Sequence, residues 1–247
     1  APRRRQPPLA DAVTRAPTAV VMAAGEGRRM RPLTERWPKP MLPIDGRPVL
    51  ATLLRDLAGA GIERVWVVSG HLGAQVEALV GDGSAWKLEA RVVRQPEPLG
   101  SADAVRRALE AGAEPPLLVA AADTVFSPGD LERASVCPDG EAAGALGVRY
   151  SAEPGRTPVR VEAGRIVALG EGDDRGLTGA PLWLLGPELA AALATLPGPP
   201  FELGRAIRDA IAAGKTILAV ELGPTRDLTR PEDVVRENFP YLWDMER

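Results

Sequence analysis

The 247-residue sequence contains a single cysteine, Cys137, and a single histidine, His71. One cysteine excludes an intramolecular disulfide, and the two residues are too few for a zinc centre built from cysteine and histidine ligands. A chain with one cysteine is typical of a reducing compartment, and the sequence therefore predicts a cytoplasmic protein. We expect Cys137 to lie in a turn without a chemical role, and His71 to cap or pack against a helix, because neither has a partner ligand.

Long apolar runs and strong net charge are also lacking. The run LLVAAADTVF is interrupted by Asp123, well short of the roughly 18 residues of a membrane-spanning helix. A formal net charge of −3, with acids and bases interspersed, favours neither nucleic acid nor an anionic membrane as a partner. The basic, proline-rich start has no apolar segment of signal-peptide length behind it, and we expect residues 1–17 to form a poorly ordered arm.

Aromatic residues are scarce: the chain has five tryptophans, two tyrosines and three phenylalanines. Three of them, Phe239, Tyr241 and Trp243, nevertheless lie together near the C-terminus. Such a cluster suits either a cap on the core or a contact in a homo-oligomer, and the sequence leaves both hypotheses open.

Short β-type runs alternate with amphipathic helical stretches through the first half of the chain. The pattern predicts strands near 18–24, 63–70, 89–95 and 116–123, with helices at 49–61, 73–80 and 101–112 between them. This alternation is typical of stacked βαβ units and a mostly parallel sheet covered by helices. In the second half, glycine and proline turns join the strands expected at 141–151, 158–170 and 177–185, which predicts a mixed sheet. Two helices, a strand near 216–222 and a last helix from 230 complete the order.

The segment AAGEGRRMRPLT leaves the first expected strand at its carboxyl end, where ligands bind in open α/β sheets. Gly25 and Gly27 let the backbone turn sharply and bring bare N–H groups against a phosphate, which a Cβ would obstruct. Prolines at positions 32, 38, 40 and 43 forbid a helix directly after the turn. We therefore expect a stiff loop that carries Arg29 and Lys39.

Two familiar phosphate-binding patterns do not fit this loop. A dinucleotide fingerprint needs a third glycine where the chain has Met30, and a Walker loop needs a lysine where it has Arg28. Glycine amides flanked by a guanidinium and an ammonium still suit a triphosphate, as in phosphoryl or nucleotidyl transfer. Taken alone, the same residues also suit a solvated basic loop.

The stretch VVMAAGEGRRMRPLTERWPKPMLPI, which ends at Ile44, resembles the opening signature of the sugar-1-phosphate nucleotidyltransferases, also called nucleoside-diphosphate-sugar pyrophosphorylases. The resemblance implies an α/β fold with a three-layer, Rossmann-like mixed sheet of the glycosyltransferase-A type. It implies Arg29 and Lys39 as catalytic residues. It also implies a nucleotide site that includes Ala23, Ala24, Gly25, Gly27 and Arg28.

Two later segments extend the resemblance. RQPEPLGSADAV is similar to the block that reads the nucleotide base, which implies roles for Gln95, Gly100 and Ser101. Asp123 ends an apolar strand, where the family places a ligand of Mg²⁺ that also borders the nucleotide, and such a carboxylate is costly without a cation. TRDLTRPEDVVREN is similar to the family's last block, which implies Asp227 as the second Mg²⁺ ligand. Asp227 could instead merely precede a helix N-terminus.

The part of the chain that would bind the acceptor departs from the family. Pro158 stands where the family has a glycine, and Gly172 and Asp173 follow Glu171 where a lysine that grips the sugar phosphate is expected. The resemblance still implies acceptor roles for four residues: Glu171, Thr178, Gly179 and Glu202. The absent positive charge could come from Arg156, Arg160 or Arg175, so we expect an unusual sugar phosphate or a cyclitol phosphate as acceptor.

The resemblance therefore implies an Mg²⁺-dependent enzyme that joins a nucleoside triphosphate to a sugar-1-phosphate and releases pyrophosphate. UTP or dTTP is favoured as the nucleotide, and GTP and CTP stay open. We expect one domain over 18–247, with a nucleotide-binding half near 18–125 and an acceptor-binding half near 126–247. A non-catalytic subunit that senses nucleotide or sugar phosphate on the same fold is the alternative, although it would not need both metal carboxylates.

Overall fold

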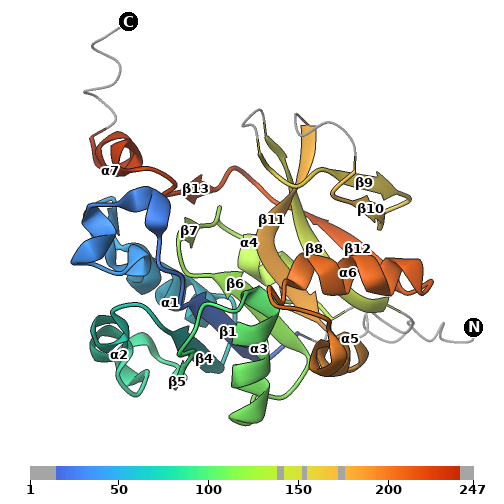
Figure 1. Cartoon of the computed structure of the whole chain (residues 1–247), viewed down its shortest axis with the longest axis horizontal. Coiled ribbons are helices and arrows are strands. Elements are labelled where there is room, and N and C mark those ends of the chain that lie inside the picture. Colours follow the sequence, from blue (N-terminus) through green and yellow to red (C-terminus); the bar gives the residue numbers. More distant parts are fainter. Residues whose placement is uncertain (1–14, 138–141, 152–154, 172–175, 240–247) are drawn as a thin grey trace, which may run out of the picture.

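The computed structural model describes residues 15–137, 142–151, 155–171 and 176–239 (Figure 1). Its centre is a nine-stranded sheet in the order β5-β4-β1-β6-β11-β8-β12-β10-β9. These strands are β1 (Thr18–Ala23), β4 (Arg64–Ser69), β5 (Glu89–Arg94), β6 (Leu117–Ala121), β8 (Ala142–Ser151), β9 (Val159–Glu162), β10 (Arg165–Leu169), β11 (Gly176–Leu185) and β12 (Thr216–Glu221). The strands β5, β4, β1 and β6 are mutually parallel, whereas β11 runs antiparallel to both of its neighbours. The predicted change from a parallel to a mixed sheet is confirmed.

Helices cover both faces of this sheet. They are α1 (Val49–Gly59), α2 (Gly73–Val80), α3 (Ser101–Glu110), α4 (Asp130–Ala134), α5 (Pro187–Ala192), α6 (Leu203–Ala212) and α7 (Pro231–Asn238). Side chains alternate between the faces along β1: Val20 packs with α3, α5 and α6, whereas Ala19 and Val21 pack with α1, α2 and α4. Because both sides of β1 are buried, its apolar sequence needs no polar alternation. The result is the three-layer arrangement expected from the sequence.

The strand order reverses at β1, which determines where a ligand can bind. Parallel strands flank β1, with β4 on one side and β6 on the other. The chain runs from β1 to β4 and β5 through α1 and α2 on one face of the sheet and returns to β6 through α3 on the other face, and this reversal opens a crevice at the carboxyl ends of β1 and β6. The N–H of Ala122 donates to the carbonyl of Met22 over 3.1 Å, so the two strand ends remain in register at this crevice.

A short antiparallel pair brings a distant segment to the same edge. β7 (Thr124–Val125) follows β6, and β13 (Arg226–Asp227) precedes α7. Asp227 lies directly opposite Thr124 in this pair. The pairing places Asp227 beside Asp123, although about a hundred residues separate them in sequence. The sequence did not predict this two-stranded element.

Several local expectations can be compared with the structure. Of the arm expected over 1–17, residues 15–17 belong to the folded domain, because Arg15 bridges to Val136 and Ala16 is fully buried, and residues 1–14 lie outside the described part of the chain. Cys137 is half-buried, and burial raises the pKa of its thiol, which makes it less reactive. Tyr241 and Trp243 lie outside the described residues. Among those that are described, no helix has the length and apolar character to cross a membrane.

Candidate active site

The loop after β1 is held in shape by its own residues. Gly27 has a φ of 61°, in the left-handed region that favours glycine. Three short 3-10 turns follow, namely η1 (Arg28–Met30), η2 (Leu33–Glu35) and η3 (Lys39–Met41), so the prolines exclude an α-helix here as predicted. Met30 is buried in a small apolar cluster with Leu228, which anchors the loop to the segment before α7. A stiff loop of this kind can present backbone N–H groups and charges at constant positions.

His71 takes part in this anchoring. The hydroxyl of Thr34 donates to the carbonyl of Gly27 over 2.9 Å, and the Nε2 of His71 lies 2.7 Å from the carbonyl of Thr34. The backbone N–H of His71 also bonds to the carbonyl of Ala24 over 3.3 Å. The packing role expected for His71 is thus the support of the loop, rather than the cap of a helix.

The loop's lysine pairs with the carboxylate at the end of β6. The Nζ of Lys39 donates to Oδ2 of Asp123, and the two side chains are only 16% and 27% exposed. Arg29 makes no ion pair with any described residue and is exposed at the mouth of the crevice. At the carboxyl ends of β1 and β6, the charge of Lys39 is therefore neutralised, whereas the guanidinium of Arg29 is available to a ligand.

The orientation of the Gln95 side-chain amide is determined by two acceptors. Its Nε2 donates to the carbonyl of Gly100 over 3.1 Å and to Oδ2 of Asp103 over 2.8 Å. A flipped amide would point its oxygen at both acceptors, so the nitrogen must face them. The Oε1 of Gln95 accepts no hydrogen bond from a described residue and is left as an acceptor for a ligand.

Asp103 is a buried carboxylate whose ionised form is stabilised. Burial opposes its ionisation, but the bond from Gln95 and the charges of Arg106 and Arg107 outweigh burial and hold its pKa below the ordinary value. The sequence analysis did not single out Asp103. An acid four residues before Arg107 and three before Arg106 on one helix was the available signal.

We predict that Asp103→Asn lowers the free energy of unfolding by about 1–3 kcal/mol at pH 7, because a buried charged hydrogen-bonding partner is lost. A lowered folded-state pKa stabilises the fold above the unfolded value of about 4, and this contribution is lost as pH falls through the folded pKa. The difference between variant and wild type should therefore shrink below about pH 4. Denaturant unfolding at pH 7, 5 and 3 measures this, and parallel pH curves would contradict it.

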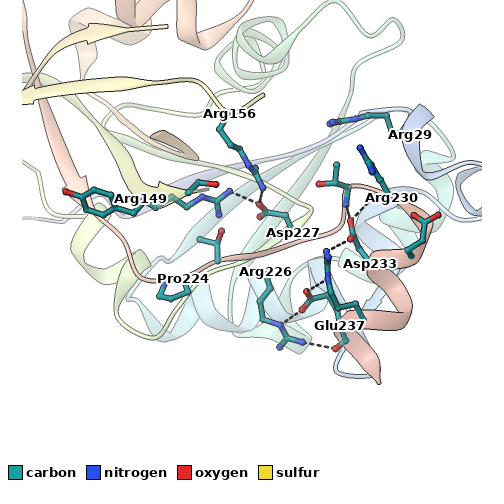
Figure 2. Close-up of a pocket in the computed structure, with 15 residues that line it drawn as sticks. Arg29, Arg149, Arg156, Pro224, Arg226, Asp227, Arg230, Asp233 and Glu237 are labelled. Carbon is teal, nitrogen blue, oxygen red and sulfur yellow. Dashed lines mark hydrogen bonds and ion pairs between the residues drawn. The ribbon is translucent and has the colours of Figure 1, made fainter. Parts of the chain in front are cut away.

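Asp227 lies in an unusual environment. The Nη2 atoms of Arg149 and Arg156 lie 2.7 Å and 2.9 Å from the same carboxylate oxygen, Oδ2 (Figure 2). Its Oδ1 is buried and accepts no hydrogen bond from the described part of the chain. Burial opposes ionisation, but the charge of Arg149 and then that of Arg156 hold the pKa of Asp227 below its ordinary value. Arg149 was not singled out from sequence, although an arginine inside the apolar run of β8 was a signal.

Three cavities surround these residues. The glycine-loop cavity, of about 430 Å³, lies against Gly25, Gly27, Gln95 and Gly100. The Trp183 cavity, of about 370 Å³, lies across β11, and the arginine cavity, of about 890 Å³, lies beside α7. The first two share Arg29, Lys39, Ala121, Asp123 and Thr229; the last two share Arg29, Arg156, Asp227 and Thr229. Arg29 and Thr229 line all three cavities, so the cavities meet at one point.

The structure brings together the residues implied for the nucleotide. The glycine-loop cavity is lined by all of them: Ala23, Ala24, Gly25, Gly27, Arg28, Arg29, Lys39, Gln95, Gly100, Ser101 and Asp123. The side chain of Arg28 is partly occupied by another residue, because its Nε donates to the carboxylate of Glu26 over 2.6 Å. The remaining metal candidate, Asp227, lines the adjoining Trp183 cavity.

The residues implied for the acceptor are less well gathered. Gly179 lines the Trp183 cavity, whereas Thr178 is fully buried and donates to the carbonyl of Arg149 over 3.2 Å. Glu202 accepts the hydroxyl hydrogen bond of Ser101 over 2.5 Å at the start of α6. Glu171 is exposed after β10 and lines none of the three cavities described above.

The three arginines considered for the absent charge separate clearly. Arg160 is 64% exposed and pairs with Glu162 over 3.5 Å, outside the three cavities. Arg175 lies outside the described residues. Arg156 lines both the Trp183 cavity and the arginine cavity, so of the two described arginines it is the one at the site.

The donor set fits a hard divalent cation. Asp123 and Asp227 both line the Trp183 cavity, and the β7–β13 pair places Asp227 opposite Thr124, the residue that follows Asp123. Mg²⁺ commonly binds one or two carboxylates together with substrate phosphates and water. The buried Oδ1 of Asp227, which no described group satisfies, is a ligand available for such an ion. The residues present therefore fit the metal implied by the resemblance.

Comparison with known proteins identifies the family. A protein-family model described as nucleotidyl transferase matches residues 18–153, which is more than half of the chain. The chain belongs to this nucleotidyl transferase family. The match covers the loop after β1, the Gln95 segment and Asp123, and thus the whole lining of the glycine-loop cavity apart from Thr229.

Individual nucleotidyl transferases are similar over different spans. The mannose-1-phosphate guanylyltransferase of Mycobacterium tuberculosis is 48% identical over 83 residues, which are 34% of this chain and 23% of that protein. The CMP-5'-(3-aminopropyl)phosphonate synthase of Streptomyces rubellomurinus is 38% identical over 128 residues, 51% of this chain and 20% of that protein. The chain thus spans less than a quarter of the length of both curated relatives.

Solved structures show the same fold. The inositol-1-phosphate CTP transferase from T. maritima superposes with a TM-score of 0.76 at 21% sequence identity, over 90% of this chain and 93% of that one. At this identity the likeness establishes the fold of the nucleotidyl transferase. The names of the relatives differ in both nucleotide and acceptor, so they do not determine either for this chain.

Proposed function

We propose that this nucleotidyl transferase joins a nucleoside triphosphate to a phosphate- or phosphonate-bearing acceptor and releases pyrophosphate. An acceptor oxygen forms a bond to the α-phosphorus, and the bond from that phosphorus to the oxygen bridging to the β-phosphate breaks. The observation that carries this proposal is the junction of the glycine-loop cavity with the Trp183 cavity at Arg29, Lys39 and Asp123. Two substrates in these cavities would meet at a group of fixed charges.

The groups at the junction suit the needs of this reaction. Transfer at phosphorus asks the protein mainly for positioning and for stabilisation of charge. Gly25 and Gly27 allow backbone N–H groups to approach the phosphates, Arg29 supplies a forked donor, and Lys39 supplies a compact charge. Mg²⁺ held by Asp123 and Asp227 would neutralise phosphate charge and align the reacting groups.

Gln95 carries the choice of base in this proposal. Because its Nε2 is held by Gly100 and Asp103, only Oε1 can meet the base, and it needs a donor. Uracil, thymine and guanine carry a ring N–H on their pairing edge, whereas cytosine and adenine can offer only an exocyclic amino group as donor there. UTP and dTTP, which the resemblance favours, are our first candidates.

The acceptor pocket is weakly polar away from the charges. Leu146, Leu169, Pro181 and Trp183 form much of the wall of the Trp183 cavity, and its uncharged hydrogen-bonding side chains among the described residues are threonines and the indole of Trp183. A sugar with many hydroxyl groups would find few partners in this described wall. We propose a sugar or cyclitol phosphate, or a phosphonate, with an unusual ring or chain.

The test is pyrophosphate release, measured with a coupled phosphate assay in Mg²⁺. UTP, dTTP, GTP, CTP and ATP are crossed with a panel of sugar-1-phosphates, inositol phosphates and alkylphosphonates. We expect release with one combination that contains UTP or dTTP, and a kcat/KM for glucose-1-phosphate below that of the best acceptor. Nucleotide binding without release across the whole panel would favour the non-catalytic sensing subunit instead.

A further inference from the structure

Gln95 lies in the wall of the glycine-loop cavity with its side-chain amide held in one orientation. The residue is only 5% exposed, and its Nε2 donates to two acceptors, the carbonyl of Gly100 and Oδ2 of Asp103. A primary amide has two N–H donors and one acceptor oxygen, so both donors are in use. Oε1 is the atom that can meet a ligand, and Gln95 therefore acts on the base as an acceptor.

The two acceptors that hold Gln95 differ in kind. The carbonyl of Gly100 belongs to the backbone, also accepts the N–H of Ala104 over 3.2 Å, and would be present with any side chain. The carboxylate of Asp103 lies closer to Nε2 and depends on the residue type at this position. Hydrogen bonds to a charged acceptor are about twice as strong as neutral ones. Asp103 is therefore the side chain that decides which atom of the amide faces the cavity.

Asp103 is itself fixed by its neighbours on α3. The Nη2 of Arg106 donates to Oδ1 over 2.8 Å, and the Nε of Arg107 lies 3.5 Å from Oδ2. The guanidinium of Arg106 in turn lies over the ring of Phe201, 4.2 Å from the ring centre. The side chain of Asp103 is only 5% exposed, and its partners hold it in the ionised form. Because an ionised carboxylate only accepts hydrogen bonds, it cannot hold an amide that has turned its oxygen inward.

We propose that Asp103 is a positioning residue that determines which bases the protein accepts, because it keeps the oxygen of Gln95 toward the base. This inference rests on the proposed function. A fixed acceptor matches the ring N–H of uracil, thymine or guanine, whereas cytosine and adenine would bring a ring acceptor against it. Asp103 lines none of the three cavities, so it acts on the nucleotide only through Gln95.

An asparagine at position 103 would remove this constraint. If its oxygen stays with Arg106, its nitrogen faces the nitrogen of Gln95, and two donors are then in contact. The amide of Gln95 would turn in part of the molecules, although the carbonyl of Gly100 opposes a complete turn. We therefore expect Asp103→Asn to lose base selectivity rather than to reverse it.

Calorimetric titration of the full chain, in Mg²⁺ and without acceptor, measures this selectivity independently of catalysis. UTP is compared with CTP, and GTP with ATP, so that the ring donor changes while the ring system stays the same. In the better-bound pair, wild type should favour the base with the ring N–H by about tenfold or more, which corresponds to one such hydrogen bond. This ratio should approach unity in Asp103→Asn. A ratio that the substitution leaves unchanged, or a wild type that prefers the other base of the pair, would overturn the proposal.

Asp130→Asn is the matched control. Asp130 is a fully buried carboxylate of α4 that pairs with Arg133 and accepts the backbone N–H groups of Ser127 and Gly223, each over 3.1 Å. It lines none of the three cavities. Its substitution should lower the melting temperature much as Asp103→Asn does and leave the nucleotide ratio unchanged. A ratio that falls equally in both variants would trace the effect to lost stability and would overturn the proposal.

A double variant tests whether Asp103 acts through Gln95. Gln95→Ala alone should lower the ratio as Asp103→Asn does, and combining the two substitutions should lower it no further, because the amide to be oriented is gone. A further change in the double variant would contradict this route. Asp103→Ser, whose hydroxyl can donate or accept, repeats the test with a second side chain, and melting temperatures verify that each variant is folded.

The two proposals fail separately. Lost selectivity in Asp103→Asn, without pyrophosphate release from any acceptor, would reject the nucleotidyl transfer reaction alone. Pyrophosphate release by wild type, with a base selectivity that Asp103→Asn leaves intact, would reject the role of Asp103 alone.

Discussion

Asp123→Ala is expected to reduce pyrophosphate release by at least about a thousandfold, with nucleotide still bound. Asp123 holds Lys39 in an ion pair at the junction of the glycine-loop and Trp183 cavities, and it is one of the two proposed metal ligands. Its loss would remove a ligand of the metal and the partner that fixes Lys39, and both cations would stabilise charge at the reacting phosphorus. Preorganised groups that stabilise such charge individually contribute about a hundredfold to a thousandfold. Single-turnover kinetics with the best substrate pair measure the change.

Two further variants make the Asp123 result interpretable. Asp123→Asn preserves the shape of the side chain and tests the charge alone, and we expect it to be nearly as inactive as Asp123→Ala. Asp209→Ala removes an exposed carboxylate of α6, which pairs with Arg205 over 3.7 Å, and should leave the rate unchanged. An Asp123→Ala enzyme with more than a tenth of wild-type activity would show that the reaction does not depend on this carboxylate.

Gly100→Ala is expected to lower the free energy of unfolding by about 3 kcal/mol or more, and with it the melting temperature by about 6–12 °C. Gly100 has a φ of 117°, which side-chain-bearing residues rarely adopt. An added Cβ would lie 2.8 Å from the carbonyl carbon of Phe201 and closer still to its oxygen. That carbonyl accepts the N–H of Ala102 at the start of α3, so it cannot move without disturbing the helix.

Gly25→Ala provides the contrast for this prediction. A Cβ at Gly25 would meet no protein atom within 4 Å, and the residue does not have a positive φ. We therefore expect unchanged stability but at least about a tenfold loss of nucleotide affinity, because the new methyl group would stand between the loop and the phosphates. Thermal unfolding and nucleotide titration of both variants test this. A destabilised Gly25→Ala variant would show that the glycine serves the structure of the loop. A variant that binds nucleotide normally would show that Gly25 does not face the phosphates.

The arrangement of the site explains why its acceptor half is harder to predict than its nucleotide half. The residues that line the glycine-loop cavity come mostly from three segments with short, recognisable patterns: the loop after β1, the segment after β5 and the end of β6. The Trp183 and arginine cavities draw on β8, β11, α6 and the segment before α7, which are remote in sequence. Contacts such as that of Arg149 with Asp227 have no local pattern, because they depend on the pairing of distant strands.

The sequence by itself determined the strands of the central sheet, most of the helices, the parallel-to-mixed change of the sheet and the sheet edge where the cavities lie. These follow from local rules: the period of apolar residues, the prolines after Gly27 and the acid at the end of β6. Only the tertiary structure decided that Asp227 lies beside Asp123, that Arg156 and not Arg160 reaches the site, and that Asp103 orients Gln95. Those relations arise from strand pairing and from the balance of buried charge across the whole chain, which no short segment contains.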